Sequence, residues 1–369
     1  MPESELTIET KCKPIWIRQY PISEEYKSAV DLKVQEWIDA GVVVPAPPNC
    51  PWNLPLIAAR KPGKDGIPDG VRVCIDARRL NAEILVTPNN NLPTIREIQN
   101  SLGGFEWLSV IDLADSYHQF AIRPEDQQKL AFTWGKHGHL MFTGVPFGVK
   151  TMTDHMQRLM EKLLGPCGKK PFLDDVATAS KSTSEHIQDV LQVLIALTYT
   201  AGLRLRLKKC KFFVKKARVL GSLITQQGIR MDPLKVRVIQ EWPRPTDAKA
   251  MQRFLGAANF HREFSHEYAQ IAAPLEDVRN AKGMIDWTPE RCQAFVKIKE
   301  LFASGISLQN VDWNKPIYLT TDASLLEIDA WIGQSNIKGD IVPVICVSKK
   351  LSLTQQRWSA TKRELYGLI

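Results

Sequence analysis

The chain has 369 residues, of which 44% are hydrophobic and 24% charged, and its formal net charge is +8. This length is enough for two or three domains, each with its own core. A mean hydropathy of −0.20 without a long apolar run excludes a membrane span, and no signal peptide opens the sequence. The positive charge favours polyanionic partners.

The cysteines predict an intracellular protein, cytoplasmic or nuclear, and not a secreted one. They are odd in number and never closely paired, which indicates neither a disulfide framework nor a zinc site. We interpret them as reduced packing residues. The seven are Cys12, Cys50, Cys74, Cys167, Cys210, Cys292 and Cys346.

The first predicted helix runs from about Glu24 to Ala40, with Ser23 as its N-cap and Gly41 as its stop. One stripe of this helix is apolar: Tyr26, Val30, Val34, Trp37 and Ile38. Next comes a predicted strand pair, Pro55–Ala59 and Val71–Ala77, joined by a tip rich in turn formers at residues 61–70.

The middle of the chain predicts an alternation of strands and helices. A central strand is expected at Trp107–Leu113 and a hairpin at residues 129–134 and 140–145. Gly148 then precedes a helix that lasts to about Leu164, and a second hairpin follows that carries Asp174 and Asp175. Another helix is expected at Glu185–Ala201. This order indicates an α+β fold, an antiparallel sheet backed by helices.

Between Arg204 and Arg218, eight of fifteen residues are Arg or Lys, and apolar residues separate them. Strand alternation would place the charges on one face and the apolar groups on the other. Such a face could bind phosphates, or it could simply be a solvated strand face. A further hairpin is expected through Gly221 and Gly228.

The last part of the chain begins with helical patterns at residues 235–242, 248–264 and 289–302. Strands are expected at residues 317–323, 330–334 and 342–347, followed by a helix at residues 354–369.

Two acidic blocks stand where an apolar strand meets a turn: Val110–Tyr117, with Asp112, and Pro171–Val176, with Asp174 and Asp175. An unpaired charge in such a place is costly. Two divalent cations bound by the three carboxylates would remove this cost and suit displacement at phosphorus. Taken alone, an Asp-Asp pair between apolar residues is also typical of a tight hairpin turn.

In its motifs the chain resembles the reverse transcriptases of LTR retroelements, both gypsy-type retrotransposons and retroviruses. The resemblance covers most of the chain, and the order and spacing of the motifs make it specific. The motifs are Ile17–Ile22, Cys50–Asn53, Lys61–Gly63, Arg72–Asn81, Ile111–Gln119, Gly144–Gly148, Phe172–Asp175, Val219–Gly221 and Phe254–Gly256.

The resemblance implies a right-hand polymerase with an antiparallel palm sheet. Residues 1–230 would form fingers and palm, residues 231–310 thumb and connection, and residues 311–369 the truncated N-terminal part of an RNase H-like domain. The implied activity is RNA-directed DNA polymerisation, in which dNTPs are added to a primer 3′-hydroxyl on an RNA or DNA template. The implied partners are template, primer and dNTPs, with no membrane; the oligomeric state stays open.

The resemblance also implies roles for individual residues. Asp112 and Asp174 would bridge two Mg²⁺ ions, for which Mn²⁺ could substitute, with Asp175 as the supporting carboxylate. Lys61 and Arg72 would contact the incoming triphosphate. In the nucleotide pocket, Tyr117 would lie under the sugar and exclude a 2′-hydroxyl, beside Phe147 and Gly148. By composition alone, the two cations would be surface residues and the tyrosine a core residue.

Some positions depart from the family pattern. Phe172 stands where the family usually has Tyr, and Lys150–Met152 replaces the usual Asn-Ala-Pro. In the RNase H-like part, Asp322 and Glu364 match the first two metal ligands, while Glu327 and Asp329 replace glycines. Because the other ligands would lie beyond residue 369, we expect no useful ribonuclease H activity, and Glu364 could equally be a solvated helix residue.

Two other functions remain open. The first is a non-catalytic nucleic-acid-binding remnant of a retroelement polymerase. Phe172 and Lys150–Met152 favour it, and the intact carboxylates and cations oppose it. The second is another right-hand polymerase that copies only DNA, which the Ile17–Ile22 segment and the RNase H-like start disfavour.

Overall fold

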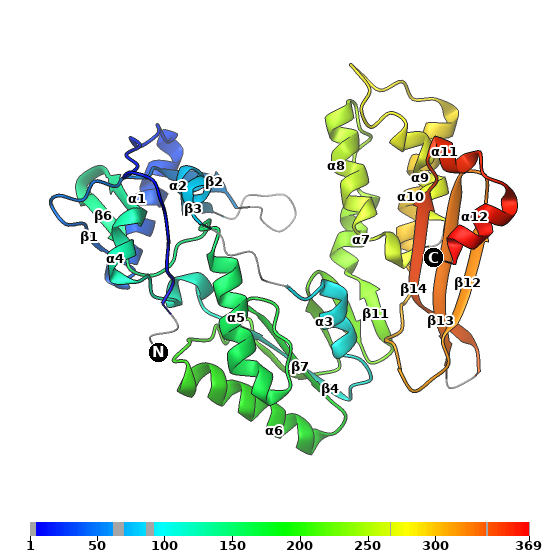
Figure 1. Ribbon diagram of the computed structural model, residues 1–369, viewed down its shortest axis with the longest axis horizontal. Coiled ribbons are helices and arrows are strands. Elements are labelled where there is room, and N and C mark those ends of the chain that lie inside the picture. The colour runs from blue at the N-terminus through cyan, green and yellow to red at the C-terminus, as the bar shows by residue number, and fades with distance from the viewer. Residues whose placement is uncertain (1–4, 62–69, 86–91, 266, 337–338, 369) are drawn as a thin grey trace. The chain divides into compact units, whose positions relative to one another are not determined.

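The computed structural model describes residues 5–61, 70–85, 92–265, 267–336 and 339–368 (Figure 1). The chain divides into two compact units. Unit 1 consists of Met1–Thr94, Ile111–Ala177 and Ile187–Cys210, and unit 2 of Ile95–Val110, Thr178–His186 and Lys211–Ile369. None of the helices in the described ranges has both the length and the apolar character needed to span a bilayer.

The helices of the described residues are α1 (Glu24–Asp39), α2 (Arg78–Glu83), α3 (Ile95–Ser101), α4 (Pro124–Gln127), α5 (Met152–Leu164), α6 (Thr183–Leu194), the π-helix η7 (Ile195–Thr200), α7 (Pro233–Gln240), α8 (Ala248–Asn259), the 3₁₀-helix η8 (Arg262–Phe264), α9 (Tyr268–Glu276), α10 (Pro289–Ala303), α11 (Leu353–Gln356) and α12 (Ala360–Gly367). The strands are β1 (Val43–Pro45), β2 (Leu56–Arg60), β3 (Val71–Ile75), β4 (Trp107–Asp112), β5 (Ala131–Trp134), β6 (Gly138–Phe142), β7 (Asp175–Ser180), β8 (Lys211–Val214), β9 (Lys216–Val219), β10 (Ser222–Thr225), β11 (Gly228–Met231), β12 (Tyr318–Ala323), β13 (Glu327–Ser335) and β14 (Ile341–Lys350).

The strands form small sheets with the orders β1-β6-β5, β2-β3, β7-β4-β8, β11-β10-β9 and β12-β13-β14. Neighbouring strands run antiparallel in β1-β6-β5, β2-β3, β11-β10-β9 and β12-β13-β14. The prediction of an α+β fold with antiparallel sheets is therefore confirmed, and so is the central position of β4.

The core of unit 1 forms where α1 meets the β1-β6-β5 sheet. The helical spacing of Val30, Val34 and Trp37 places all three on one buried face. The Trp37 ring lies edge-on to Phe142 at 5.1 Å between ring centroids, and Phe142 also contacts Phe132 at 5.2 Å. This aromatic cluster fixes the helix on the sheet.

The helices of unit 2 begin where capping residues predict. Asp232, Asp247 and Thr288 each accept a backbone N–H of the first turn, which starts α7, α8 and α10. The Phe254 ring then packs against Phe295 at 4.8 Å between centroids and joins α8 to α10. In Figure 1, α12 lies beside the β12-β13-β14 sheet, and Gly367 of that helix faces Ile328.

A buried histidine joins β4 to β7. His186 is fully buried, its Nε2 lies 2.7 Å from Ser109 Oγ, and its Nδ1 lies 2.7 Å from Ser180 Oγ. Ser109 Oγ also accepts the Phe213 N–H at 3.1 Å. Because both ring nitrogens of His186 and the two serine hydroxyls have hydrogen-bond partners, these buried polar groups fix the strand spacing at little cost.

The structure corrects the prediction for the basic stretch 204–218. It is not one alternating strand: Leu205 forms an isolated bridge with Leu113, a turn follows at residues 207–209, and only then do β8 and β9 begin. The turn takes the backbone away from the sheet, because Lys209 N–H and Cys210 N–H bond back to the Arg206 carbonyl.

Two smaller expectations are also corrected, and one helix was not predicted. Ser23 occupies the N-cap position of α1, but its side chain makes no capping hydrogen bond. The predicted final helix is two helices, because Ser359 caps α12 anew by accepting the Lys362 N–H. Sequence analysis did not predict α9, whose interior contains Pro274, a residue that usually breaks helices.

Glu327 and Asp329 form a buried acidic pair on β13. Glu327 is only 3% exposed, and its Oε2 has no hydrogen-bond partner among the described residues. Asp329 Oδ1 likewise has none. Burial, reinforced by the neighbouring charge of Asp329, raises the pKa of Glu327 well above its ordinary value of 4.5. The folded state therefore holds a proton that the unfolded chain releases.

This pair makes stability depend on pH. We expect the free energy of unfolding to fall as pH rises from the ordinary carboxyl pKa through the raised value, by at most about 1.4 kcal/mol per pH unit. Urea unfolding between about pH 5 and about pH 8 measures it. Glu327→Gln should flatten the dependence, and the exposed Glu364→Gln should leave it unchanged; equal slopes in all three proteins would contradict the interpretation.

Candidate polymerase active site

The three predicted carboxylates lie in unit 1, at the end of β4 and at the turn before β7. Asp112 is the last residue of β4, Asp175 is the first of β7, and Asp174 is in the turn. Partial removal from water, together with the charges of Asp174 and Asp112, raises the pKa of Asp175 to about 6. The structure therefore brings the three residues into one electrostatic cluster.

The donor set of this cluster fits a hard divalent cation. Carboxylate oxygens are the ligands that such ions prefer. Oδ1 of Asp112 is buried and lacks a hydrogen-bond partner among the described residues, and Asp174 Oδ2 accepts only a long bond of 3.2 Å from Ser116 Oγ. The fit is one of ligand chemistry and not of spacing, because within the described part of the chain no group of three or more Asp, Glu, His or Cys side chains is arranged closely enough to hold a metal ion.

The turn that carries Asp174 is tight and strained. Phe172 and Asp175 exchange two backbone hydrogen bonds of 3.1 and 3.0 Å, which leaves Leu173 and Asp174 as its central residues. Leu173 has a φ of +55°, a left-handed conformation that costs roughly 1–2 kcal/mol for a residue with a Cβ. Because both bonds use the backbone, the presence of Phe172 in place of the family's usual Tyr leaves the turn closed.

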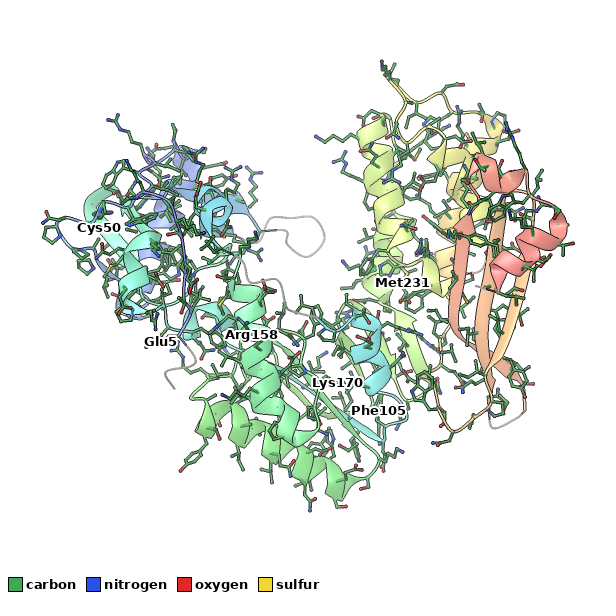
Figure 2. The ribbon with its side chains drawn as sticks, viewed as in Figure 1. Glu5, Cys50, Phe105, Arg158, Lys170 and Met231 are labelled. Atoms are coloured by element: carbon green, nitrogen blue, oxygen red, sulfur yellow. The ribbon has the colours of Figure 1, made fainter. Side chains whose placement is uncertain are left out.

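Gln157 holds this strained turn from α5. Its side chain is 2% exposed, its Oε1 accepts the Leu173 N–H at 2.8 Å, and its Nε2 donates to the Pro171 carbonyl at 2.9 Å. A further bond of 2.8 Å joins Nε2 to Glu161. Figure 2 shows the neighbouring Arg158 on α5, which is exposed. Gln157 was not among the predicted site residues. A polar Gln among the buried, mostly apolar positions of a helix is a signal that could have identified it.

The predicted nucleotide-pocket residues lie close together. The rings of Tyr117 and Phe147 are 4.8 Å apart between centroids. Burial and the charge of Asp174 raise the pKa of Tyr117, which places its hydroxyl in the field of the carboxylate cluster. The aromatic pair and the acidic cluster are therefore neighbours.

The loop around Gly148 requires glycine and is held by Asn81. Gly148 has a φ of +100°, and a Cβ on Gly144 would lie 2.3 Å from the His118 carbonyl oxygen. Asn81 Nδ2 donates to the Gly148 carbonyl at 2.6 Å, and its Oδ1 accepts the Lys150 N–H at 2.9 Å. The start of Lys150–Met152, the segment that differs from the family pattern, is thus anchored through its backbone, and this contact does not depend on its side chains.

Lys61 and Arg72 flank the tip of the β2-β3 hairpin. Ala59 pairs with Arg72, and Lys61 N–H bonds to the Gly70 carbonyl. By strand alternation, the two cations lie on the same face. Both are exposed; most of the predicted tip, residues 62–69, lies outside the described residues.

The two RNase H-like carboxylates, Asp322 and Glu364, do not form a cluster like that of the three polymerase carboxylates. Asp322 lies on β12 opposite Asp329, and Glu364 lies on α12; both are exposed. Among the described residues, no hydrogen bond or ion pair links the two. The structure gives no geometric sign that they act together.

The comparisons with known proteins agree with this fold. Residues 59–224 match the family described as "Reverse transcriptase (RNA-dependent DNA polymerase)", and residues 287–369 match "RNase H-like domain found in reverse transcriptase". A foamy viral protease-reverse transcriptase determined in complex with double-stranded DNA has a similar fold, with a TM-score of 0.87 and 24% identity over 97% of this chain and 62% of that one.

The similar curated proteins are retrotransposon polyproteins. The chain is 34% identical over 365 residues to the retrovirus-related Pol polyprotein from transposon 297 of Drosophila melanogaster, with 98% of this chain and 33% of that protein covered. It is 29% identical over 373 residues to the Tf2-3 polyprotein of Schizosaccharomyces pombe, with 100% and 27% covered. The chain thus spans about a third of these relatives.

The fold is that of a right-hand polymerase, with palm sheet and RNase H-like domain. Within that class, the chain is a reverse transcriptase segment of the LTR retroelement kind, and the resemblance seen in its motifs is confirmed.

Gln157 provides a test of how the turn is held. Gln157→Leu keeps the volume but removes both hydrogen bonds to the turn, so we expect polymerisation kcat to fall by about ten- to a hundred-fold, with template–primer affinity unchanged. Single-turnover primer extension and fluorescence anisotropy measure the two quantities. Glu161→Gln is the matched control, since it still accepts from Gln157. Wild-type kcat in a folded Gln157→Leu protein would exclude this role.

Proposed function

We propose that this chain is an RNA-directed DNA polymerase that adds dNTPs to a primer 3′-hydroxyl on an RNA or DNA template. The observation that carries the proposal is the carboxylate cluster, in which the charges of Asp112 and Asp174 both act on Asp175. Structural hydrogen bonding does not account for it, because Asp112 Oδ1 has no partner among the described residues. A carboxylate cluster that contains a buried oxygen without a structural partner is typical of a metal-dependent site.

We further propose that Asp112 and Asp174 hold two Mg²⁺ ions, or Mn²⁺ in their place, with Asp175 in support. When bound, such ions supply positive charge that stabilises the attacking and leaving oxygens of an in-line displacement. The residues of the chain orient the reaction. The Gln157-held turn fixes Asp174 and Asp175, and the end of β4 fixes Asp112.

On the nucleotide side, Lys61 and Arg72 would bind the triphosphate of the incoming dNTP. Their common face on the β2-β3 hairpin and their exposure support this role. Tyr117, whose ring contacts Phe147 in a tilted arrangement and which lies near Asp174, would lie under the sugar and exclude a 2′-hydroxyl. Gly148 would let the backbone approach the base pair, since its φ of +100° suits glycine alone.

The proposed partners are an RNA or DNA template and a primer. A net charge of +8 and the similar structures determined with double-stranded DNA and with an RNA/DNA hybrid support this.

We propose fingers and palm at residues 1–230, thumb and connection at 231–310, and RNase H-like carboxylates at Asp322 and Glu364. The cysteines, none of which forms a disulfide among the described residues, support an intracellular location.

A non-catalytic nucleic-acid-binding remnant is the second candidate function, and two departures favour it. Phe172 removes a hydroxyl from the turn, and Lys150–Met152 alters the start of α5. Against it, the backbone of Phe172 still closes the turn, and Lys150 N–H is still held by Asn81.

A primer-extension assay distinguishes the polymerase from the non-catalytic remnant. The wild-type protein should extend a labelled DNA primer on an RNA template with Mg²⁺ and dNTPs. Asp174→Asn should reduce the rate by about a hundred- to a thousand-fold, because a carboxylate that would hold the charge-stabilising cations is lost. Asp39→Asn, at the exposed end of α1, is the control and should extend normally. A folded wild-type protein that binds template–primer without extending it would instead identify the remnant.

A further inference from the structure

The backbone of Asp112 is held by the segment that precedes β8. Arg206 N–H donates to the Asp112 carbonyl at 2.9 Å, and Ala114 N–H donates to the Arg204 carbonyl at 2.9 Å. Between these bonds, Leu113 and Leu205 form an isolated antiparallel bridge. A single bridge of this kind is a weak attachment for a residue whose carboxylate must be placed accurately.

Gln119 strengthens this attachment with one side chain. Its Oε1 accepts the Arg204 N–H at 2.6 Å. Its Nε2 donates to the Arg204 carbonyl at 3.1 Å and also to the carbonyl of Ala114. The amide thus uses both its donors and its acceptor to join the turn after Asp112 to the opposite backbone.

Cys210 supplies the second attachment, at Asp112 itself. Because the turn at residues 207–209 takes the backbone away, the Asp112 N–H donates to Cys210 Sγ at 3.3 Å. The thiol in turn lies 3.8 Å from the Asp112 carbonyl and 3.5 Å from the Arg206 carbonyl. A peptide group left unpaired at this point would carry a desolvation cost.

We propose that Gln119 and Cys210 are positioning residues that fix Asp112 for metal binding. The inference rests on the proposed polymerase function and adds to it the residues that orient its first carboxylate. Their contacts are with backbone, and neither side chain belongs to the carboxylate cluster. They act as outer supports, whose loss in metal sites typically costs ten- to a hundred-fold in affinity.

The primary test is metal binding, which needs no turnover. Mn²⁺ titration followed by electron paramagnetic resonance should give a dissociation constant at least about ten-fold weaker in Gln119→Leu and Cys210→Ala than in the wild-type protein. Cys210→Ser should restore most of the affinity, since a hydroxyl also accepts the Asp112 N–H. The Mn²⁺ affinity of Gln119→Glu should stay weak. In this variant a carboxylate oxygen, which cannot donate, replaces the amide nitrogen that donates to the Ala114 and Arg204 carbonyls.

Two control variants separate positioning from general stability. Gln127 makes a similar bond from its Nε2 to the Ile122 carbonyl, and Cys167 is a partly exposed cysteine of the same unit. Gln127→Leu and Cys167→Ala should keep the wild-type Mn²⁺ affinity. A structural role alone would lower the melting temperature of the variants without changing the affinity of the folded protein. If Gln119→Leu does not fold, Gln119→Glu carries the test.

Primer extension then gives a second readout. In the positioning variants, the Mg²⁺ concentration for half-maximal extension should rise in step with the Mn²⁺ dissociation constant, with the KM for template–primer unchanged. Unchanged Mn²⁺ affinity in all folded variants would overturn the inference. A wild-type protein that binds Mn²⁺ but does not extend primers would reject the polymerase function and leave the metal-binding comparison valid.

Discussion

The mutual repulsion of three carboxylates is the constraint on which the rest of the site depends. Burial raises the pKa of Asp175, and Asp174 and Asp112 lie close enough for their charges to add to this effect, which brings the pKa to about 6. Charges brought together in this way destabilise the fold unless cations are bound or the backbone is held firmly. Here the backbone on each side is held by a polar side chain, the buried Gln157 on one side and the partly buried Gln119 on the other, and the apolar core around α1 and α5 supports them.

Single amide side chains do much of this holding. Gln157 and Gln119 each bond to backbone groups that lie outside the regular strands. Asn81 does the same for the loop around Gly148. An amide suits this purpose because it offers both donors and an acceptor without charge, so it can be buried beside carboxylates without adding to their repulsion.

Sequence reasoning succeeded where the signal was local and periodic. The stripe of α1 and the position of β4 followed from apolar spacing. It failed where tertiary contacts override local preference. The basic stretch has strand-like alternation at Arg204–Leu207, yet a turn interrupts it, and α9 forms despite Pro274. In both places, packing against neighbouring elements decides the backbone, and no local pattern reports it.

The sequence by itself determined the family resemblance and the candidate carboxylates, because motif order and acidic blocks at strand ends are properties of the linear chain. Only the tertiary structure identified what holds them. Gln157 acts on residues 14 and 16 positions away, Gln119 on one 85 positions away, and Cys210 on one 98 positions away. Hydrogen bonds across such separations depend on how the chain folds back. The presence of a glutamine or cysteine in the sequence does not predict which distant backbone group it will bond.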